Sequence, residues 1–329
     1  MKKIIKSLAL IFAAILTLAA LASCVSPETV DSELEINVTV LNGTTGFGAA
    51  KLISDSSEAK NQLNYKFTIE SDASNITAGL LNGSIDIAAL PTNAAANLYN
   101  KSGGRIQIAA VNTLGVLYLM VNGEKVTIEK LADLEGQTVY CPAQNPAHIF
   151  EAICKAHNVN VTIDTAYARP DDLRTALVSG KVDIAVLPEP MVTIAKSANA
   201  KLITALDLTD EWDKAYGEGT LMQGCIVVRT DWAKAHPKEL DTFLDEYRGS
   251  IEYTIKRPTA TSELIVSTGV FGGKAAVAAA ALPNCNIVYI DGEDMAESLD
   301  VFFEKLYAVK PAAIGGKLPD SGIYYIEND

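Results

Sequence analysis

One segment of this chain occurs twice in closely similar form. Residues 80–91 read LLNGSIDIAALP and residues 177–188 read LVSGKVDIAVLP, so both contain Gly-x-Ile/Val-Asp-Ile-Ala-x-Leu-Pro. Hydrophobic periodicity predicts that a strand, a helix, a second strand and a second helix precede each repeated strand. These elements are expected at 36–41, 47–54, 66–70 and 74–81 in the first copy, and at 138–141, 147–156, 160–164 and 170–178 in the second.

Alternating strands and helices favour mostly parallel sheets with helices on both faces. Two copies of such a unit predict two similar lobes of the α/β class. Convergence of strand chemistry can explain a short Asp-Ile-Ala match by itself. The matching order of five elements makes coincidence the weaker explanation.

The segments outside the repeat indicate how the lobes are joined. Chain crossings near residues 120 and 224 predict a two-strand hinge, so lobe one consists of residues 35–122 and 225–329, and lobe two, residues 123–224, is inserted into it. The expected fold is two Rossmann-like lobes with parallel or mixed sheets. Further strands are expected at 106–111, 116–121, 201–205, 221–229 and 286–290, helices at 232–235, 239–255, 260–266 and 294–307, and a loop rich in acidic residues and glycine between 205 and 221.

The first 23 residues have the pattern of a secretory signal. Three lysines precede an uncharged apolar run over residues 8–22, which is short for a membrane-spanning helix. The run ends in LASC and resembles a bacterial lipobox, which implies cleavage before Cys24 and attachment of lipid to that cysteine. Residues 1–23 are therefore expected to be a signal peptide and 24–34 a lipidated linker. An ordinary signal with a chance cysteine and a single-span anchor are the alternatives.

The charge balance excludes several classes of partner. Lys and Arg number 27 against 40 Asp and Glu, which gives a net charge of −13 at pH 7. No basic cluster offsets this acidity, so nucleic-acid binding is disfavoured, and so is broad adsorption to anionic lipid. No later segment approaches the ~20 continuous apolar residues of a membrane helix, so we expect a soluble body on a lipid tether.

The cysteines and histidines do not indicate a catalytic or metal site. Beyond Cys24 the cysteines are Cys141, Cys154, Cys225 and Cys285; Cys141 with Cys154 is the local candidate for a disulfide, and buried free thiols are the alternative. The three histidines show neither Ser–His–Asp spacing nor the three or four converging ligands of a metal site. No cofactor, metal or catalytic residue is therefore predicted.

Ligands of open parallel sheets bind beyond the carboxyl ends of the strands, which selects a few short segments of this chain. Tyr118 is a further candidate there, for an aromatic wall with Phe47, unless both rings belong to the core. The candidate ligand-binding residues are Asn42, Thr44, Thr45, Gly46, Phe47, Thr92, Asn93, Asn112 and Thr113 in lobe one, Gln144, Asn145 and Glu189 in lobe two, and Gln223 on the crossing strand.

Each of these segments also has an ordinary structural explanation. Residues 42–46 precede a helix whose free N–H groups can hold an anion or another acceptor, yet the same turn can simply cap that helix. Gln144 and Asn145 can reach a ligand or cap the next helix. Glu189 favours a ligand with a cationic or N–H edge if it faces the space between the lobes, and is otherwise a solvated surface acid.

Several longer motifs resemble a known family. They are NGTTGFGAAKL at 42–52, DIAALP at 86–91, NTLGVLY at 112–118, DLEGQTVY at 133–140 and DIAVLPEP at 183–190. Together with the lipobox they are similar to the substrate-binding lipoproteins of ABC importers of the nitrate/taurine/sulfonate and thiamine-precursor type, over essentially the whole mature chain. The sequence departs from the family pattern at two places: Thr44 stands where relatives often have proline, and residues 143–146 replace a Gly/Thr-rich turn. The resemblance therefore does not predict the identity of the solute.

The resemblance implies a type II periplasmic-binding fold and no chemical reaction. A monomer would hold a small-molecule solute between its lobes and deliver it to ABC permease and ATPase subunits. Its acylated N-terminus would lie in the lipid membrane, at the outer face of the bacterial cytoplasmic membrane. A binding protein that reports to a receptor is the alternative. An enzyme on the same fold has no support in the residues, and the Cys-rich iron motif of related pyrimidine synthases is missing.

Overall fold

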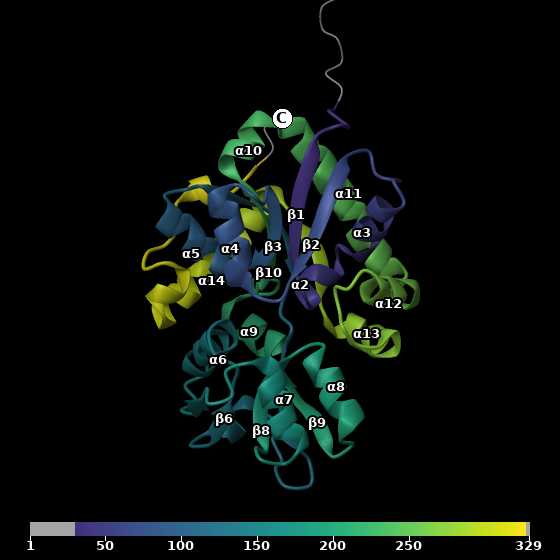
Figure 1. The fold of residues 1–329 in the computed structure, drawn as a ribbon. Helices are drawn as coiled ribbons and strands as arrows, with labels where there is room; N and C mark the ends of the chain where they lie inside the picture. Colours follow the sequence, from purple (N-terminus) through teal and green to yellow (C-terminus); the bar gives the residue numbers. More distant parts are fainter. Residues whose placement is uncertain (1–29, 327–329) are drawn as a thin grey trace, which may run out of the picture.

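The computed structural model describes residues 30–326 and arranges them in two lobes, one above the other in Figure 1. The predicted signal peptide and Cys24 lie outside the described residues. Within residues 30–326, no helix is both long enough and apolar enough to cross a membrane.

The upper lobe is built on a mixed sheet of six strands. Their bounds are β1 Glu35–Leu41, β2 Asn64–Glu70, β3 Ile87–Pro91, β4 Ile106–Thr113, β10 Gly224–Arg229 and β11 Ile287–Ile290. Their order in the sheet is β11-β4-β10-β3-β1-β2. β1 runs parallel to β2 and β3, whereas β10 is antiparallel to both β3 and β4. The returning strand β10 therefore makes the sheet mixed.

Helices cover both faces of this sheet (Figure 1). The helices are α2 Thr44–Phe47, α3 Ala50–Ser57, α4 Ala73–Asn82, α5 Thr92–Ser102, α10 Thr230–Ala235, α11 Pro237–Lys256, α12 Pro258–Ser267, α13 Ala275–Ala281 and α14 Gly292–Val309. One apolar cluster joins α4, α5 and α14 to the sheet, and another joins α3, α11 and α12 to its opposite face. Both faces are buried, which fits the nearly continuous apolar strands.

The lower lobe repeats this design on a smaller mixed sheet. Its strands are β5 Leu117–Asn122, β6 Thr138–Tyr140, β7 Thr162–Asp164, β8 Ile184–Pro188 and β9 Leu202–Asp207, in the order β7-β6-β8-β5-β9. Its helices are α6 Asn145–Ala156, α7 Pro170–Val178, α8 Met191–Ala198 and α9 Leu208–Tyr216. The expected fold class is confirmed. Residues 117–122 were expected in lobe one, but β5 pairs with β8 and β9, so this strand belongs to the lower sheet.

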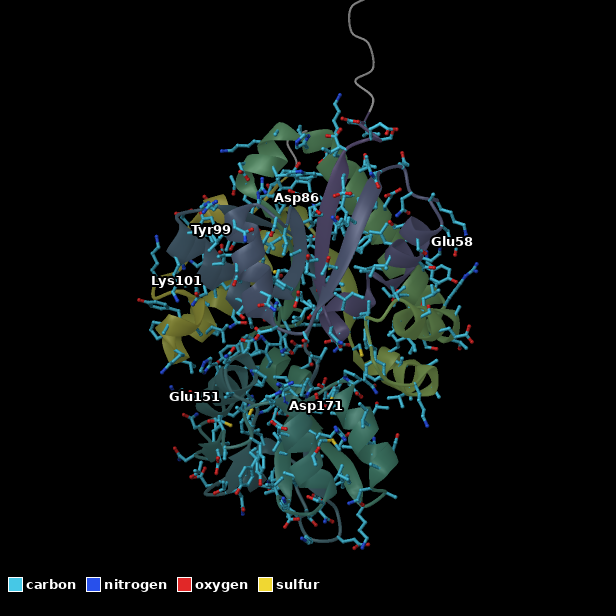
Figure 2. All side chains as sticks on the ribbon, in the orientation of Figure 1. Glu58, Asp86, Tyr99, Lys101, Glu151 and Asp171 are labelled. Atoms are coloured by element: carbon cyan, nitrogen blue, oxygen red, sulfur yellow. The ribbon has the colours of Figure 1, made fainter. Side chains whose placement is uncertain are left out.

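The repeated aspartate has a structural role in each lobe. Asp86, labelled in Figure 2, accepts a hydrogen bond from the backbone N–H of Asn37 at 2.9 Å and lies 3.4 Å from the guanidinium of Arg229. Its counterpart Asp183 forms an ion pair with Lys125 at 2.9 Å. The acid thus anchors the entry to the last strand of each repeat to a neighbouring segment.

The expected loop between 205 and 221 is wrong over most of its length, because α9 occupies 208–216. The carboxylate of Asp207 accepts the N–H of Thr209 at 2.8 Å, which is an N-cap, and Asp210 and Glu211 lie in the first turn, where the helix dipole favours acids. The acidic residues that suggested a loop therefore stabilise the N-terminus of helix α9. Helices α8 and α13 were not predicted either, and the expected helix over 47–54 is two helices, α2 and α3.

An apolar seam connects the two lobes beside the hinge. The indole of Trp212 on α9 is fully buried, with its ring centroid 5.8 Å from that of Phe302 on α14. α6 and α9 of the lower lobe and α14 of the upper lobe belong to one continuous cluster of buried residues. The lobes are therefore joined by packed side chains as well as by the two crossing segments.

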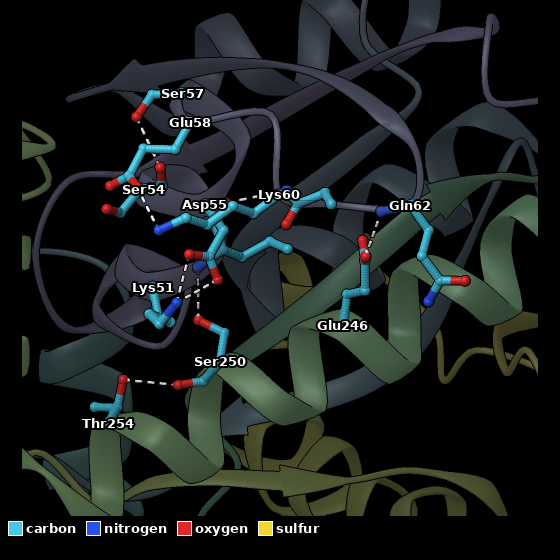
Figure 3. Close-up of polar contacts among 12 residues, drawn as sticks. Lys51, Ser54, Asp55, Ser57, Glu58, Lys60, Gln62, Glu246, Ser250 and Thr254 are labelled. Atoms are coloured by element: carbon cyan, nitrogen blue, oxygen red, sulfur yellow. Dashed lines mark hydrogen bonds and ion pairs between the residues drawn. The ribbon is translucent and has the colours of Figure 1, made fainter.

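The long helix α11 fixes the segment that follows β1 (Figure 3). The hydroxyl of Ser250 accepts the N–H of Leu52 at 3.1 Å and donates to the carbonyl oxygen of Gly48. The carboxylate of Glu246 accepts the Tyr65 hydroxyl at 2.7 Å. The bonds of Ser250 hold the end of α2 and the start of α3, and the bond of Glu246 holds β2, so that α11 fixes the position of the segment over 42–46.

All four cysteines beyond Cys24 are buried free thiols. Of the two alternatives left open by the sequence, the structure therefore has the free thiols and not a Cys141–Cys154 disulfide.

Candidate functional site

A chain of backbone hydrogen bonds links strand ends of both lobes at the hinge. The N–H of Thr92 donates to the carbonyl of Gln223 at 3.1 Å, and the N–H of Gln223 donates to the carbonyl of Thr113 at 3.0 Å. The side-chain Oε1 of Gln223 accepts the N–H of Val116 at 2.7 Å, and the carbonyl of Val116 accepts the N–H of Glu189 at 3.0 Å. The structure thus brings four predicted site residues together, with Gln223 at their centre.

Asn112 attaches the loop over 42–46 to this centre. Its side-chain Nδ2 donates to the carbonyl of Thr45 at 3.0 Å and to the hydroxyl of Tyr247 at 2.9 Å, while its Oδ1 accepts the Thr113 hydroxyl at 3.0 Å. Asn112 is almost fully buried, so its amide is committed to protein partners. Its position favours a role in holding the loop.

Residues 42–46 were expected to precede a helix, but α2 already begins at Thr44, and the residues of this segment differ in exposure. Asn42 is exposed, with its N–H bonded to the carbonyl of Glu70 at 2.7 Å, whereas Thr44 and Thr45 are half-buried. Gly46 is required for space, because a Cβ there would collide with the carbonyl oxygen of the preceding strand's last residue. Phe47 is fully buried against Phe271, at 6.0 Å between ring centroids, so it belongs to the core and forms no wall of an open site.

The first turns of α5 and α6 each hold an asparagine with an unused acceptor. The Oδ1 atoms of Asn93 and Asn145 are buried and have no hydrogen-bond partner within residues 30–326. Gln144, directly before α6, is exposed and has φ +67°, a left-handed conformation that is uncommon outside glycine. Buried acceptors are normally satisfied, so these amides are candidates for contact with a bound molecule.

A cavity of ≈ 550 Å³ lies between the lobes. Of the predicted residues, only Glu189 and the wall candidate Tyr118 line it. The hydroxyl of Tyr118 donates to the carbonyl of Asn284 at 2.9 Å, across the lobe boundary. The lining residues are Tyr118, Glu189, Val192, Thr193, Lys196, Ser197 and Thr204 from the lower lobe, and Ala280 and Asn284 from the upper lobe.

Glu189 is a buried acid at the start of α8, so the alternative of a solvated surface acid is wrong. It is 3% exposed, and its carboxylate accepts the N–H and hydroxyl of Thr193, at 3.1 and 2.9 Å, and the side-chain N–H of Asn284 at 3.5 Å. Burial raises the pKa of Glu189, although the bonds from Thr193 and Asn284 and the charge of Lys196 oppose the shift. The carboxylate caps α8 and faces the inter-lobe cavity.

We expect Glu189→Gln to become more stable relative to the wild type as the pH rises. A carboxyl whose pKa is raised by folding binds more protons in the native than in the unfolded state, so its contribution to stability is present at low pH and lost as the pH rises through the folded-state pKa. Glutamine keeps an acceptor for Thr193 but cannot ionise. Urea unfolding of both proteins between about pH 4 and about pH 7 measures the difference. The raised pKa would be contradicted if the free energy of unfolding of Glu189→Gln minus that of the wild type stayed constant or decreased as the pH rises.

Seven residues of the cavity were not among the candidates expected from sequence: Val192, Thr193, Lys196, Ser197, Thr204, Ala280 and Asn284. Thr193 and Lys196 follow Glu189 by four and seven positions on α8, so they lie on one helix face. Proline before the first helical residue was an available signal for α8. Asn284 comes from a distant segment, and no local signal could have indicated it.

No metal centre is evident: within residues 30–326 no group of three or more His, Cys, Asp or Glu side chains is arranged to hold a metal ion. The polar side chains that line the cavity supply hydroxyls, one amide, one buried carboxylate and one ammonium group. Such groups bind and orient a small molecule.

A family model described as "NMT1/THI5 like" matches residues 59–261, more than half of the chain. No curated protein matches the sequence.

A solved ABC transporter protein from Parabacteroides distasonis is 23% identical, with a TM-score of 0.76 over 91% of this chain and 100% of that one. The periplasmic aliphatic sulphonate binding protein SsuA from Escherichia coli is 17% identical, with a TM-score of 0.65 over 84% and 94% of the two chains. The alkanesulfonate-binding protein SsuA from Xanthomonas axonopodis, bound to MOPS, is 13% identical, with a TM-score of 0.61 over 89% and 96%. These likenesses show a shared fold.

Proposed function

Because the chain belongs to the NMT1/THI5-like family, we propose that it binds a small solute between its two lobes and delivers it to an ABC importer. The observation that most directly supports this function is the convergence at the hinge, where Gln223 bonds to Thr113, Thr92 and Val116. Ligands of parallel sheets bind beyond such strand ends. The cavity beside Glu189 opens between the same lobes.

The mechanism we infer is closure of the lobes about the hinge. A solute that contacts both lobes stabilises the closed arrangement by its difference in affinity for the two states, and so shifts the population toward it. Asn93 on α5 and Asn145 on α6 support this mechanism, because each lobe supplies a buried amide oxygen with no partner among the described residues. The exposed Asn42 and Gln144 and the half-buried Thr44 and Thr45 are further candidates for contact.

We also propose that the protein is exported and held at the membrane by lipid on Cys24. The lipobox-like sequence before this residue supports the assignment. The tethered protein would then load ABC permease and ATPase subunits from the outer side of the cytoplasmic membrane, without a chemical step of its own.

The function is tested by screening the protein against a broad panel of small anionic, cationic and neutral solutes by thermal denaturation. A solute at 100 times its Kd stabilises the native state by about 2.7 kcal/mol. Small-angle X-ray scattering of the stabilised sample is expected to give a smaller radius of gyration. If no solute class raises the Tm or reduces the radius, the proposed function is contradicted.

With the solute in hand, we expect Asn145→Ala to weaken binding by about fivefold to tenfold, the equivalent of one hydrogen bond of about 1 kcal/mol. The matched control is Gln137→Ala, which removes an exposed amide from the same lobe. Isothermal titration calorimetry measures both variants. Equal affinity of Asn145→Ala and wild type would remove Asn145 from the site.

A further inference from the structure

One residue of the inter-lobe cavity, Tyr118, lies close to two carboxylates: Glu189 lines the same cavity, and Asp207 lies on the neighbouring strand. Tyr118, which lines the cavity, pairs directly with Asp207 in the β5–β9 register. Directly opposed residues of antiparallel strands place their side chains on the same face, with Cβ atoms about 4.5–5.5 Å apart. The pKa of the Tyr118 hydroxyl is raised, mainly by burial. It is raised further, in decreasing order, by the charges of Asp207, Glu189, the Cys285 thiol and Asp210. The carboxylates of Glu189 and Asp207 therefore lie near this one position.

Both carboxylates are poorly hydrated. Glu189 is buried at the wall of the cavity, and Asp207 is half-buried, with its carboxylate accepting the N–H of Thr209. Burial raises the pKa of both groups, because the charged form loses water contacts. A cation placed between them replaces part of this hydration, whereas an anion adds repulsion in surroundings of low dielectric constant.

A single lysine faces this acidic group. Lys196 is the only Lys or Arg among the described residues that line the cavity, and its side chain is exposed on α8. Its charge acts on Glu189, where it favours the ionised form. One exposed ammonium against the two poorly hydrated carboxylates of Glu189 and Asp207 leaves the surroundings of Tyr118 negative.

We propose that this cavity binds the nitrogen group of a small organic cation, an amine, amidine or guanidine that donates N–H groups to Glu189 and to the Tyr118 hydroxyl oxygen. An ionised carboxylate has about four acceptor positions, and the protein uses three at Glu189. The hydroxyl of Tyr118 donates its proton to the carbonyl of Asn284, so its oxygen can still accept a hydrogen bond from a ligand. The cavity volume lies within the range of about 300–1,000 Å³ typical of small-molecule sites.

The proposal rests on the proposed function, since it names the class of solute that the protein would bind between its lobes, at the cavity beside Glu189. That class differs from the aliphatic sulphonates that the E. coli neighbour is named for. A sulphonate has only acceptor oxygens and a negative charge, and would meet the carboxylate of Glu189 in the cavity wall, with that of Asp207 on the neighbouring strand.

The experiment is isothermal titration calorimetry of the protein with agmatine and propylamine hydrochlorides, and with sodium propanesulfonate, at one ionic strength. The amines are expected to give saturable binding and the sulfonate none. Glu189→Gln should weaken amine binding by at least about tenfold, because it removes a charge-assisted hydrogen bond but keeps an acceptor for α8. Lys196→Met should strengthen it. Glu129→Gln, which removes an exposed acid elsewhere on the lower lobe, should leave it unchanged.

Each other outcome overturns the cation proposal. Binding of propanesulfonate without binding of the amines rejects it and leaves the solute-binding function intact. Binding of neither compound also rejects it, and the broad solute panel then decides the function separately. Equal amine affinity in wild type and in Glu189→Gln, with unchanged circular dichroism, shows that the amine binds elsewhere. Asp207→Asn, which retains an N-cap for α9, repeats the test at a second carboxylate.

Discussion

Replacing Trp212 by alanine is expected to lower the free energy of unfolding by about 3–5 kcal/mol. The indole is fully buried, and its ring centroid lies 4.7 Å from that of Tyr216 and 5.8 Å from that of Phe302. Its Nε1 donates to the Thr220 hydroxyl at 2.9 Å. Alanine would leave a large hole between α9 of one lobe and α14 of the other, where neither side can relax without moving a lobe.

Urea unfolding at constant temperature measures this loss. Tyr307→Ala is the matched control, because Tyr307 lies on α14 but is 37% exposed, and we expect its effect to stay within about 0.5 kcal/mol. A loss below about 1 kcal/mol for Trp212→Ala would show that packed side chains do not join the two lobes at this seam in solution.

The second large effect is expected for Asn112→Ala, which should lower the free energy of unfolding by about 2–4 kcal/mol. The substitution leaves the carbonyl of Thr45 and the hydroxyl of Tyr247 without their donor, and both partners lie in or beside the core. Loss of the bond to Thr45 also frees the loop over 42–46. Solute affinity should therefore fall together with stability, which thermal denaturation with and without solute measures.

A double-mutant cycle separates the two bonds of Asn112. Tyr247→Phe removes only one partner and should cost about 1 kcal/mol. The double variant should cost less than the sum of the single ones, because the two side chains contact each other. Additive losses would indicate that the bond between Asn112 and Tyr247 contributes nothing.

The elements predicted well from sequence are those with a strong local pattern. The helix expected at 170–178 has the bounds of α7, where proline stands at the first position and Asp171 and Asp172 in the first turn. The strand beginning at Ile106 extends two residues beyond its expected end, to Thr113. By contrast, α13 reads AAVAAAA and has no alternation of polar and apolar residues that would reveal a face.

The candidate site was predicted in part for the same reason. The rule that ligands meet strand ends selected Thr92, Thr113, Glu189 and Gln223, and hydrogen bonds bring these residues together. The rule gave no information on side-chain direction, so Phe47 was included although it lies in the core. It also could not find Asn284, which contacts Glu189 from 95 positions away along the chain.

The seam formed by α6, α9 and α14 restricts how this architecture can be recombined. Grafting the inserted lobe into another scaffold would expose Trp212 on one fragment and Phe302 on the other, so each fragment would have an exposed apolar surface. Exchange of lobes between relatives, in evolution or by engineering, therefore has to bring the matching face of α14 along with the insert.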